Sequence, residues 1–582
     1  MAVSRFVSNF AAQDNKKIID MKKKTLLLLS TASLMLLTAC SGKLGALSAD
    51  NFKVTPNPLE THAGHVQATI DGTFPEKYLK RNAVVTVIPE LRFQTANGLQ
   101  TVKGQPATFQ GEKVLGNDQT ISYLLGGHYT MKTDFPYQPE MLQSDMYLTF
   151  DARVGKKEVE VPAVKVATGV IATSELYHQT LLSANPVLAP DAFQRITQQK
   201  QEANIKFLVA QTQLRKSELQ NNSVTELVSL LQRINNERET LSLNSIEVSA
   251  YASPEGSLSL NERLASGRQD VSAEYVEQQL KRTHLNAPVD TRYTAEDWEG
   301  FQQLVRASDI QDKDVILRVL SMYDDPEERE QQIRNMSEAF RELADGILPE
   351  LRRARLIANY EVIGRDDYQI QQQFRDDASK LSIEELLYAA ALTEKADEKM
   401  DIYQRATQLY PNDARAYNNI GRLYYQQGNY DQARQYFQRT LGIDRNSSEA
   451  YANLGLLELL NGNLEEAENY IGRASGSANI AEVLGNLHLA QGNYALAEQD
   501  FTGVYSNSAS LAQILNKNYA KAEQTLGKVR PIDATTDYLR AVLYARKGNN
   551  GVAGTFLRSA IGKNPALQSY ADRDLELRNI DK

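Results

Sequence analysis

The pattern of apolar and polar positions changes twice along this chain and divides it into three parts. Between residues 51 and 168, short runs alternate apolar and polar residues, as in Val66–Ile70, Ala83–Pro89 and Met146–Phe150. Turn residues separate these runs, among them Asn97-Gly98 and Gly126-Gly127. Alternation with period two, interrupted by such turns, is typical of short strands in two packed sheets. We therefore predict a β-sandwich over residues 51–168.

Between residues 170 and 365 the periods are mixed, which predicts an α/β domain. Its clearest stretch runs from Ile246 to Leu280. Ile246–Tyr251 alternates like a strand, Ser253-Pro-Glu-Gly256 has turn chemistry, and the apolar spacing from Leu260 onward is helical. A further helical pattern at about 294–348 predicts an insertion into this domain.

Residues 380–570 repeat with a period near 34. Tyr417, Gly421, Gly428, Ala433 and Phe437 return 34 positions later as Tyr451, Gly455, Gly462, Ala467 and Ile471. This pattern resembles the tetratricopeptide repeat, and related motifs on both sides raise the number to about six helix pairs. Such pairs cannot bury their apolar faces alone, so we expect them to stack into an α-solenoid.

A solenoid of this kind has a concave face that binds peptides. The positions expected on that face carry amides and a guanidinium: Asn418, Asn419, Arg422, Asn453 and Asn486. An asparagine side chain can donate to and accept from an extended peptide backbone at the same time. These five residues are the predicted contacts for a protein partner; the alternative is that they are simply solvated.

The strand–turn–helix of the middle part resembles the peptidoglycan-binding domain of the OmpA family. Asn261, Leu264-Ala265 and Arg268 follow the turn in the order and spacing of that family's helix, and Arg353-Ala354-Arg355 fits its closing motif. In the family an Asp and an Arg hold the diaminopimelate of the stem peptide. Here Ser253 stands where the Asp is expected, so Glu255 would have to replace the missing carboxylate. The resemblance implies a peptidoglycan site formed by Ser253, Glu255, Asn261, Arg268 and Arg355. The alternative is a structural turn with Arg268 on a solvated helix face.

Charge argues against a nucleic-acid partner. The formal net charge is −9 over 582 residues, and no basic stripe is present. Binding to nucleic acid depends on neutralising phosphates with Lys and Arg. We therefore expect no nucleic-acid partner.

The first forty residues predict export and a lipid anchor. Met21-Lys22-Lys23-Lys24, followed by an apolar run to Leu37, is typical of a signal peptide (residues 1–39) that begins at Met21. Leu37-Thr-Ala-Cys40 resembles a bacterial lipobox, and Cys40 is the only cysteine of the chain. We interpret Cys40 as the acylated residue and residues 40–50 as a tether; a plain signal-peptidase site is the alternative. In lipoproteins of Bacteroidota, which this segment resembles, an acidic run after the Cys marks export to the cell surface. No such run follows Cys40, which favours an outer-membrane anchor facing the periplasm.

The sequence contains no recognisable catalytic motif. It has no Walker motif, no GxSxG, no HExxH and no CxxC, and its six His are scattered. We therefore predict a non-catalytic protein without cofactor or metal. Two non-catalytic functions remain open: an envelope lipoprotein that links peptidoglycan to protein partners, or an assembly factor for a secretion system or surface fimbriae that does not bind peptidoglycan. The third alternative is an enzyme whose site has no recognisable motif.

Overall fold

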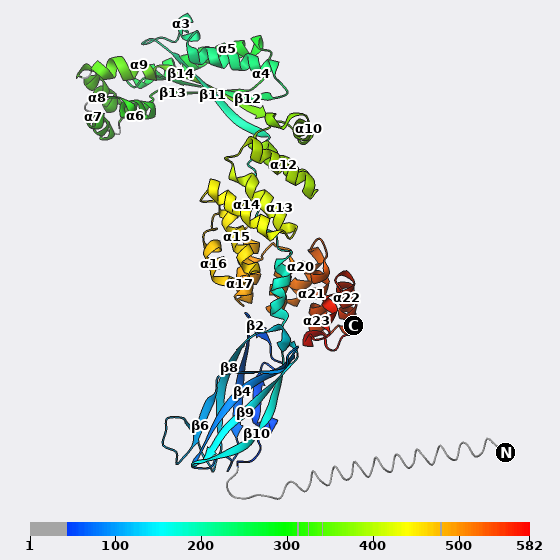
Figure 1. Ribbon diagram of the computed structural model, residues 1–582. Helices are drawn as coiled ribbons and strands as arrows, with labels where there is room; N and C mark the ends of the chain where they lie inside the picture. Colours follow the sequence, from blue (N-terminus) through cyan, green and yellow to red (C-terminus); the bar gives the residue numbers. More distant parts are fainter. Residues whose placement is uncertain (1–43, 311–312, 324, 340, 478–479, 582) are drawn as a thin grey trace, which may run out of the picture. The chain divides into compact units, whose positions relative to one another are not determined.

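The computed structural model describes residues 44–310, 313–323, 325–339, 341–477 and 480–581. The predicted signal peptide and Cys40 lie outside these residues. The chain forms two compact units. The first contains the N-terminal part up to Ala189 together with Pro411–Lys582, and the second is Pro190–Tyr410. The structure is therefore multidomain, with sheets in its N-terminal half and helical repeats at its C-terminal end (Figure 1).

Two sheets pack against each other in the first unit. One has the order β1-β3-β2 with β8 paired to β3, and the other has the order β10-β9-β4-β6-β7 with β5 paired to β4. Their strands alternate buried and exposed residues, most regularly in β8, so the inner faces form one apolar core. The strands are β1 (Phe52–Thr55), β2 (Thr61–His62), β3 (His65–Phe74), β4 (Ala83–Thr95), β5 (Gly98–Lys103), β6 (Ala107–Gly111), β7 (Gln119–Ile121), β8 (Gly127–Pro136), β9 (Ser144–Val154) and β10 (Lys157–Gly169).

The sandwich begins earlier in the chain than its predicted first residue. Leu44 and Leu47 are buried in its core, ahead of η2 (Ala49–Asn51). A second short helix, η3 (Pro139–Leu142), carries the buried Met141 and Leu142. From Leu44 onward the chain is therefore part of the domain, so residues 44–50 of the predicted tether belong to it, and residues 40–43 lie outside the described residues.

The second unit is built on a four-stranded sheet with the order β11-β14-β12-β13. Strand β12 runs parallel to β13 and antiparallel to β14. Helices α4 and α5 contribute buried apolar residues to the core of this sheet. The elements are β11 (Ile196–Lys206), α3 (Lys216–Leu219), α4 (Asn222–Asn236), β12 (Leu241–Tyr251), α5 (Leu258–Arg282), β13 (Val289–Thr294) and β14 (Arg353–Ile363).

Where the sequence pattern predicts an insertion, the structure has short helices with a small apolar core of their own, which includes Phe301, Ile316 and Leu348. The helices are α6 (Trp298–Ala307), α7 (Lys313–Ser321), α8 (Pro326–Ala339), the π-helix η5 (Leu343–Ile347) and α9 (Leu348–Leu351). The second unit ends with α10 (Asp367–Asp377), η6 (Ala378–Lys380), α11 (Ile383–Ala391) and α12 (Ala396–Leu409). The first predicted helix pair of the repeat region, α11 with α12, thus belongs to this unit and not to the other repeats.

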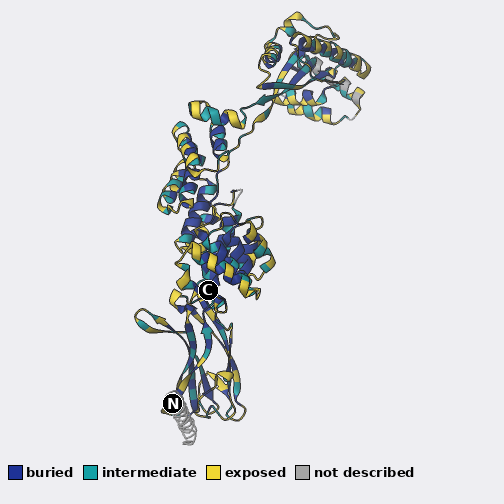
Figure 2. Cartoon of the chain, turned by 90° about the vertical axis from the view of Figure 1, so that its right-hand side faces the viewer, coloured by how far each residue is buried: buried dark blue, intermediate teal, exposed yellow. Residues whose placement is uncertain are grey.

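The remaining repeats form helix pairs in the first unit. In several pairs a glycine allows close approach: a Cβ on Gly421 would lie 2.7 Å from Phe437, and one on Gly485 would lie 2.6 Å from Phe501. Buried residues line the inside of the pairs (Figure 2). The helices are α13 (Ala414–Gln426), α14 (Tyr430–Ile443), α15 (Ser448–Leu460), α16 (Leu464–Gly472), α17 (Ala481–Ala490), α18 (Tyr494–Asp500), α19 (Asn507–Leu515), α20 (Tyr519–Lys528), α21 (Ala534–Arg546), α22 (Asn550–Lys563), α23 (Leu567–Ala571) and η7 (Leu575–Leu577).

One segment lies elsewhere than the sequence pattern predicts. Residues 170–189 were expected to open the α/β domain, but they belong to the first unit. There they form η4 (Thr173–Leu176), α2 (Tyr177–Leu181) and an extended stretch that packs along the repeats. We call residues 180–189 the groove segment. The prediction was wrong here because side-chain contacts with helices more than 200 positions away decide where this segment lies.

Candidate functional site

The concave side of the repeats is occupied by the groove segment. Asn453 on α15 accepts a hydrogen bond from the Val187 amide at 2.6 Å and donates to the Val187 carbonyl at 2.9 Å. Asn418 on α13 donates to the same carbonyl at 3.1 Å and accepts from Asn453 at 3.0 Å. Two buried asparagines thus bind both backbone groups of one residue, which is the chemistry expected for a bound peptide.

Paired backbone contacts are made to alternate residues of the segment, Val187 and Ala189. Asn419, next to Asn418 on α13, accepts from the Ala189 amide at 2.9 Å and donates to its carbonyl at 3.0 Å. Arg422 donates to the Pro186 carbonyl at 2.9 Å. A spacing of two residues per contact is that of an extended chain, in which every second residue points the same way. The groove therefore recognises extended backbone.

The contacts continue toward the N-terminal end of the groove segment. Tyr425 donates to the Leu181 carbonyl at 2.9 Å, Asn507 donates to the Ser183 hydroxyl at 3.2 Å, and the hydroxyls of Ser508 and Thr180 are bonded at 2.8 Å. Leu181, Ala184 and Val187 are at most 4% exposed and belong to the same apolar cluster as the repeat helices. The segment is therefore held by both its backbone and its side chains.

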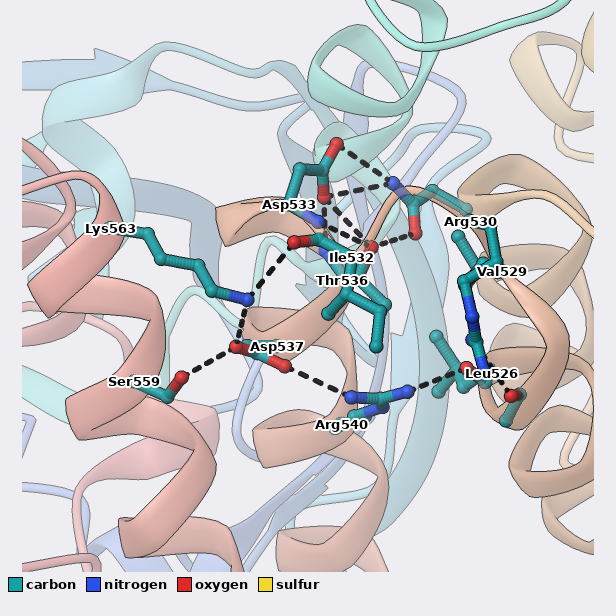
Figure 3. Close-up of polar contacts among 12 residues, drawn as sticks. Leu526, Val529, Arg530, Ile532, Asp533, Thr536, Asp537, Arg540, Ser559 and Lys563 are labelled. Atoms are coloured by element: carbon teal, nitrogen blue, oxygen red, sulfur yellow. Dashed lines mark hydrogen bonds and ion pairs between the residues drawn. The ribbon is translucent and has the colours of Figure 1, made fainter. Parts of the chain in front are cut away.

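A polar network at the C-terminal repeats supports this end of the segment (Figure 3). The Asn507 side chain that bonds Ser183 also donates to Asp533, which caps α21. The neighbouring Asp537 accepts from Ser559 at 2.6 Å and pairs with Arg540 and Lys563 at 3.1 and 2.7 Å. Burial raises the pKa of the Asp537 carboxyl, but the bonds from Lys563 and Ser559 outweigh it, so the pKa is lowered. Both oxygens of the Asp537 carboxylate are thus bonded within the protein, so this charged cluster has a structural role.

Asn486 differs from the other predicted groove residues. Its amide donates to the Glu482 carbonyl within its own helix, and its side-chain oxygen has no hydrogen-bond partner. The contact to the segment in this repeat comes instead from Glu482, which accepts from Asn185 at 3.3 Å. Burial raises the pKa of the Glu482 carboxyl, and bonds from Asn185 and Ser506 only partly offset this. The sequence analysis missed Glu482. The repeat register could have found it, because it stands three residues before Gly485, just as Asn418 stands three before Gly421.

The residues suggested by the OmpA resemblance lie around the turn between β12 and α5. Arg268 is 1% exposed. Its guanidinium donates to three backbone carbonyls, those of Tyr251 at 2.8 Å, Gln211 at 3.1 Å and Leu208 at 3.4 Å. Burial, with a contribution from the charge of Arg352, lowers the pKa of Arg268 to about 10, so it stays charged at neutral pH. Its donors are thus engaged with the protein's own backbone, and Asn261 likewise donates to the Gly256 carbonyl at 2.7 Å.

A different arginine faces the turn. Arg352 pairs with Glu255 at 2.7 Å, and Ser253 donates to the same carboxylate at 2.9 Å. Arg355, the arginine expected at this place, lies on β14 and pairs with Glu202 of β11. The reason is where the strand begins. β14 starts at Arg353, so Arg352 lies just before the strand, next to the turn. Arg355 lies within the strand, in the part that pairs with β11. The sequence motif contains several arginines, and its spacing alone does not distinguish them.

The second unit also has a groove that no described segment fills. It has a volume of about 620 Å³ and lies between α10, α11 and α12. Phe374, Leu392 and Ile402 supply apolar surface, and charged residues line its rim: Arg375, Glu394, Lys395, Glu398 and Asp401. Within the described ranges, no group of three or more His, Cys, Asp or Glu is placed to hold a metal ion. Nor is any helix of those ranges long and apolar enough to cross a membrane.

Comparisons with known proteins agree with the repeat assignment. Residues 414–447 match the tetratricopeptide repeat family. No curated protein sequence matches the chain. Among the solved structures that are similar to parts of it is the APC/C heterotetramer Cut9–Hcn1, with 18% identity and a TM-score of 0.30 over 37% of this chain and 45% of that one. A tetratricopeptide repeat protein of Parabacteroides merdae has 17% identity and a TM-score of 0.26 over 43% of this chain and 100% of that one. The pilF protein of Pseudomonas aeruginosa has 14% identity and a TM-score of 0.25 over 37% of this chain and 98% of that one. The match thus spans less than half of the first of these proteins. The chain carries a tetratricopeptide repeat, a class of repeat that serves protein interaction.

Proposed function

We propose that this protein is a non-catalytic envelope lipoprotein that acts as a scaffold for protein partners. The observation that carries the proposal is the filled groove. The side chains suited to bind a foreign peptide bind the protein's own groove segment, so the repeats serve as a fixed structural body. A partner would then bind other surfaces, and the groove between α10 and α12 offers apolar surface with a charged rim for it. The anchor in this proposal is an acylated Cys40 in the outer membrane, facing the periplasm.

Metabolic labelling with an alkyne analogue of palmitate tests the anchor. The native protein is expected to incorporate the label, because fatty acids would be attached at Cys40 as diacylglyceryl and amide-linked chains. Such chains together give stable anchoring. The variant Cys40→Ser should incorporate none, and the matched variant Ser41→Ala should be labelled like the native protein. A native protein without acyl groups would overturn the anchored scaffold. Crosslinking in labelled cells followed by mass spectrometry would identify the partner.

A specific arrangement favours a second function, the binding of peptidoglycan. Glu255 and Arg352 place a carboxylate beside a guanidinium, with side chains 27% and 11% exposed. A zwitterionic amino-acid end such as that of diaminopimelate needs such a pair, since its ammonium suits the carboxylate and its carboxylate suits the guanidinium fork. To bind it, the two residues would exchange their mutual contact for contacts with the ligand.

Sedimentation with purified sacculi tests this second function. The native protein should co-sediment, and Arg352→Ala should abolish co-sedimentation while the protein remains folded by circular dichroism. The control is Arg355→Ala, which removes a nearby arginine that pairs with Glu202 instead. If the native protein stays in the supernatant, peptidoglycan binding is wrong, and the result supports the alternative, an assembly factor for a secretion system or surface fimbriae.

A further inference from the structure

One end of the β-sandwich presents three exposed leucines. Leu115 lies in the loop between β6 and β7 and is fully exposed, at 102%. Leu124 and Leu125 lie between β7 and β8 and are 55% and 81% exposed. Single exposed leucines are ordinary, but several on neighbouring loops mark a contact surface. We call these three residues the leucine tip.

The two loops of the leucine tip are tied together and to the sandwich. Ser122 donates to Glu112 across the loops at 3.0 Å, and the Lys113 amide donates to the Arg81 carbonyl at 2.7 Å. The turn after Leu125 needs a glycine: Gly126 has φ +72°, and a Cβ there would lie 2.3 Å from the Phe74 carbonyl. The leucines are therefore displayed by an ordered turn that holds them outside the core.

The chain enters the sandwich at this same end. The Tyr78 hydroxyl donates to the Gly45 carbonyl at 3.0 Å, and the adjacent Lys77 amide donates to the Tyr123 carbonyl at 2.6 Å. Cys40 is four residues before Leu44 in the sequence. Since an extended chain spans at most about 3.6 Å per residue, the Cα atoms of Cys40 and Leu44 are no more than about 14 Å apart.

The repeats attach to the other end of the sandwich. There Ser174 of η4 bonds Thr61 of β2 at 2.5 Å, and the ring of His62 packs on Tyr494 of α18. Strand register shows that the ends are opposite: β3 starts beside β2 and finishes at Phe74, next to the leucine tip. Figure 1 shows β2 and the β6 region at opposite ends of the sandwich. The leucine tip is thus left uncovered by the repeats.

We propose that the leucine tip inserts into the phospholipid bilayer that holds the acyl chains of Cys40. The proposal rests on the proposed lipid anchor, because a linker that spans at most about 14 Å keeps this end of the sandwich close to the membrane surface. The leucines enter the boundary between headgroups and acyl chains, where apolar side chains gain from burial. Basic residues near the tip alternate with acidic ones, as in the pair of Arg81 with Glu112 at 3.3 Å, so apolar contact rather than net charge drives the insertion.

The test uses the full lipoprotein, purified in detergent and reconstituted into vesicles of phosphatidylethanolamine and phosphatidylglycerol. Leu115→Cys and Leu125→Cys are labelled with an environment-sensitive dye, and lipids brominated near the headgroup serve as quenchers. The control is Leu99→Cys, a leucine 68% exposed on the hairpin between β4 and β5. Leu99 pairs with Gln94 of β4, next to Phe93, where the pairing of β4 with β9 ends. This end of the sandwich is the one far from the leucine tip. We expect the dye at positions 115 and 125 to lose most of its fluorescence and the dye at position 99 to lose none.

Two failures give different results. If the dyes at positions 115 and 125 are quenched no more than the dye at position 99 in vesicle-bound protein, the insertion of the leucine tip is wrong and the anchor stands. If the native protein, whose only cysteine is Cys40, itself reacts with the thiol dye, then Cys40 is not acylated and the proposed anchor fails. A third variant carries the dye at position 124 (Leu124→Cys). Inserted in the bilayer, this dye should emit at shorter wavelength than in water. Adding Leu115→Asp and Leu125→Asp together should return its emission to the wavelength seen in water.

Discussion

Val187→Asp is expected to expel the groove segment and to lower the melting temperature of the first unit by about 5 °C. Val187 is 3% exposed and packs among the repeat helices, so an aspartate there would be a buried charge without a partner. Releasing the segment gives up hydrogen bonds worth about 1 kcal/mol each and buried side chains worth about 1.5–3 kcal/mol each. A net loss of about 3 kcal/mol corresponds to a shift of about 5 °C, because the entropy of unfolding grows with chain length and this unit has roughly 300 described residues. Differential scanning calorimetry measures it.

The matched control is Leu182→Asp, because Leu182 belongs to the same segment but is 49% exposed. It should change the melting temperature little. In the Val187→Asp protein, a synthetic peptide of residues 173–192 should bind the vacated groove, as followed by fluorescence anisotropy, whereas the native protein should not bind it. If Val187→Asp melts like the native protein and stays closed to the peptide, the groove segment does not hold the repeats together.

Arg268→Ala is expected to destabilise the α/β domain by about 3–5 kcal/mol. The guanidinium joins the carbonyls of Leu208, Gln211 and Tyr251, and its removal leaves buried acceptors without donors beside a cavity. Arg268→Lys should recover only a part, because an ammonium cannot reproduce the planar fork that reaches separate carbonyls. Urea unfolding followed by circular dichroism provides the measurement.

Arg352→Ala is the comparison for Arg268→Ala. Arg352 bonds Glu255 and Ser253 at the edge of the domain, and Glu255 stays partly exposed to water. We expect a loss of about 1 kcal/mol or less, in line with partly exposed ion pairs. If Arg268→Ala unfolds at the urea concentration of the native protein, then Arg268 is not a structural residue, and its role as a ligand contact returns to consideration.

The sequence predicted most of the side chains that line the groove but not the segment that occupies it. Asn418, Asn419, Arg422 and Asn453 were identified from the repeat pattern, and each bonds an extended backbone in the structure. In the next repeat Glu482 contacts the segment and the predicted Asn486 does not, because the pattern gives the helix face but not which side chain on it reaches the segment. The identity of the occupant could not be read from the sequence, since residues 180–189 show no repeat, motif or strong period.

What the sequence determined by itself is local and periodic. A period of two indicated the strands of the sandwich, and a period of 34 indicated the repeats. The lipid anchor at Cys40 stays a prediction, because that residue lies outside the described part of the chain. Only the tertiary structure decided that the groove is filled by the chain itself, that Arg268 bonds backbone carbonyls, and that Arg352 faces Glu255. The physical reason is that these are contacts between residues distant in sequence, and they depend on how packed elements bring backbone groups within bonding distance. Periodicity fixes which face of an element is buried, whereas the partner on the other side is set by the fold.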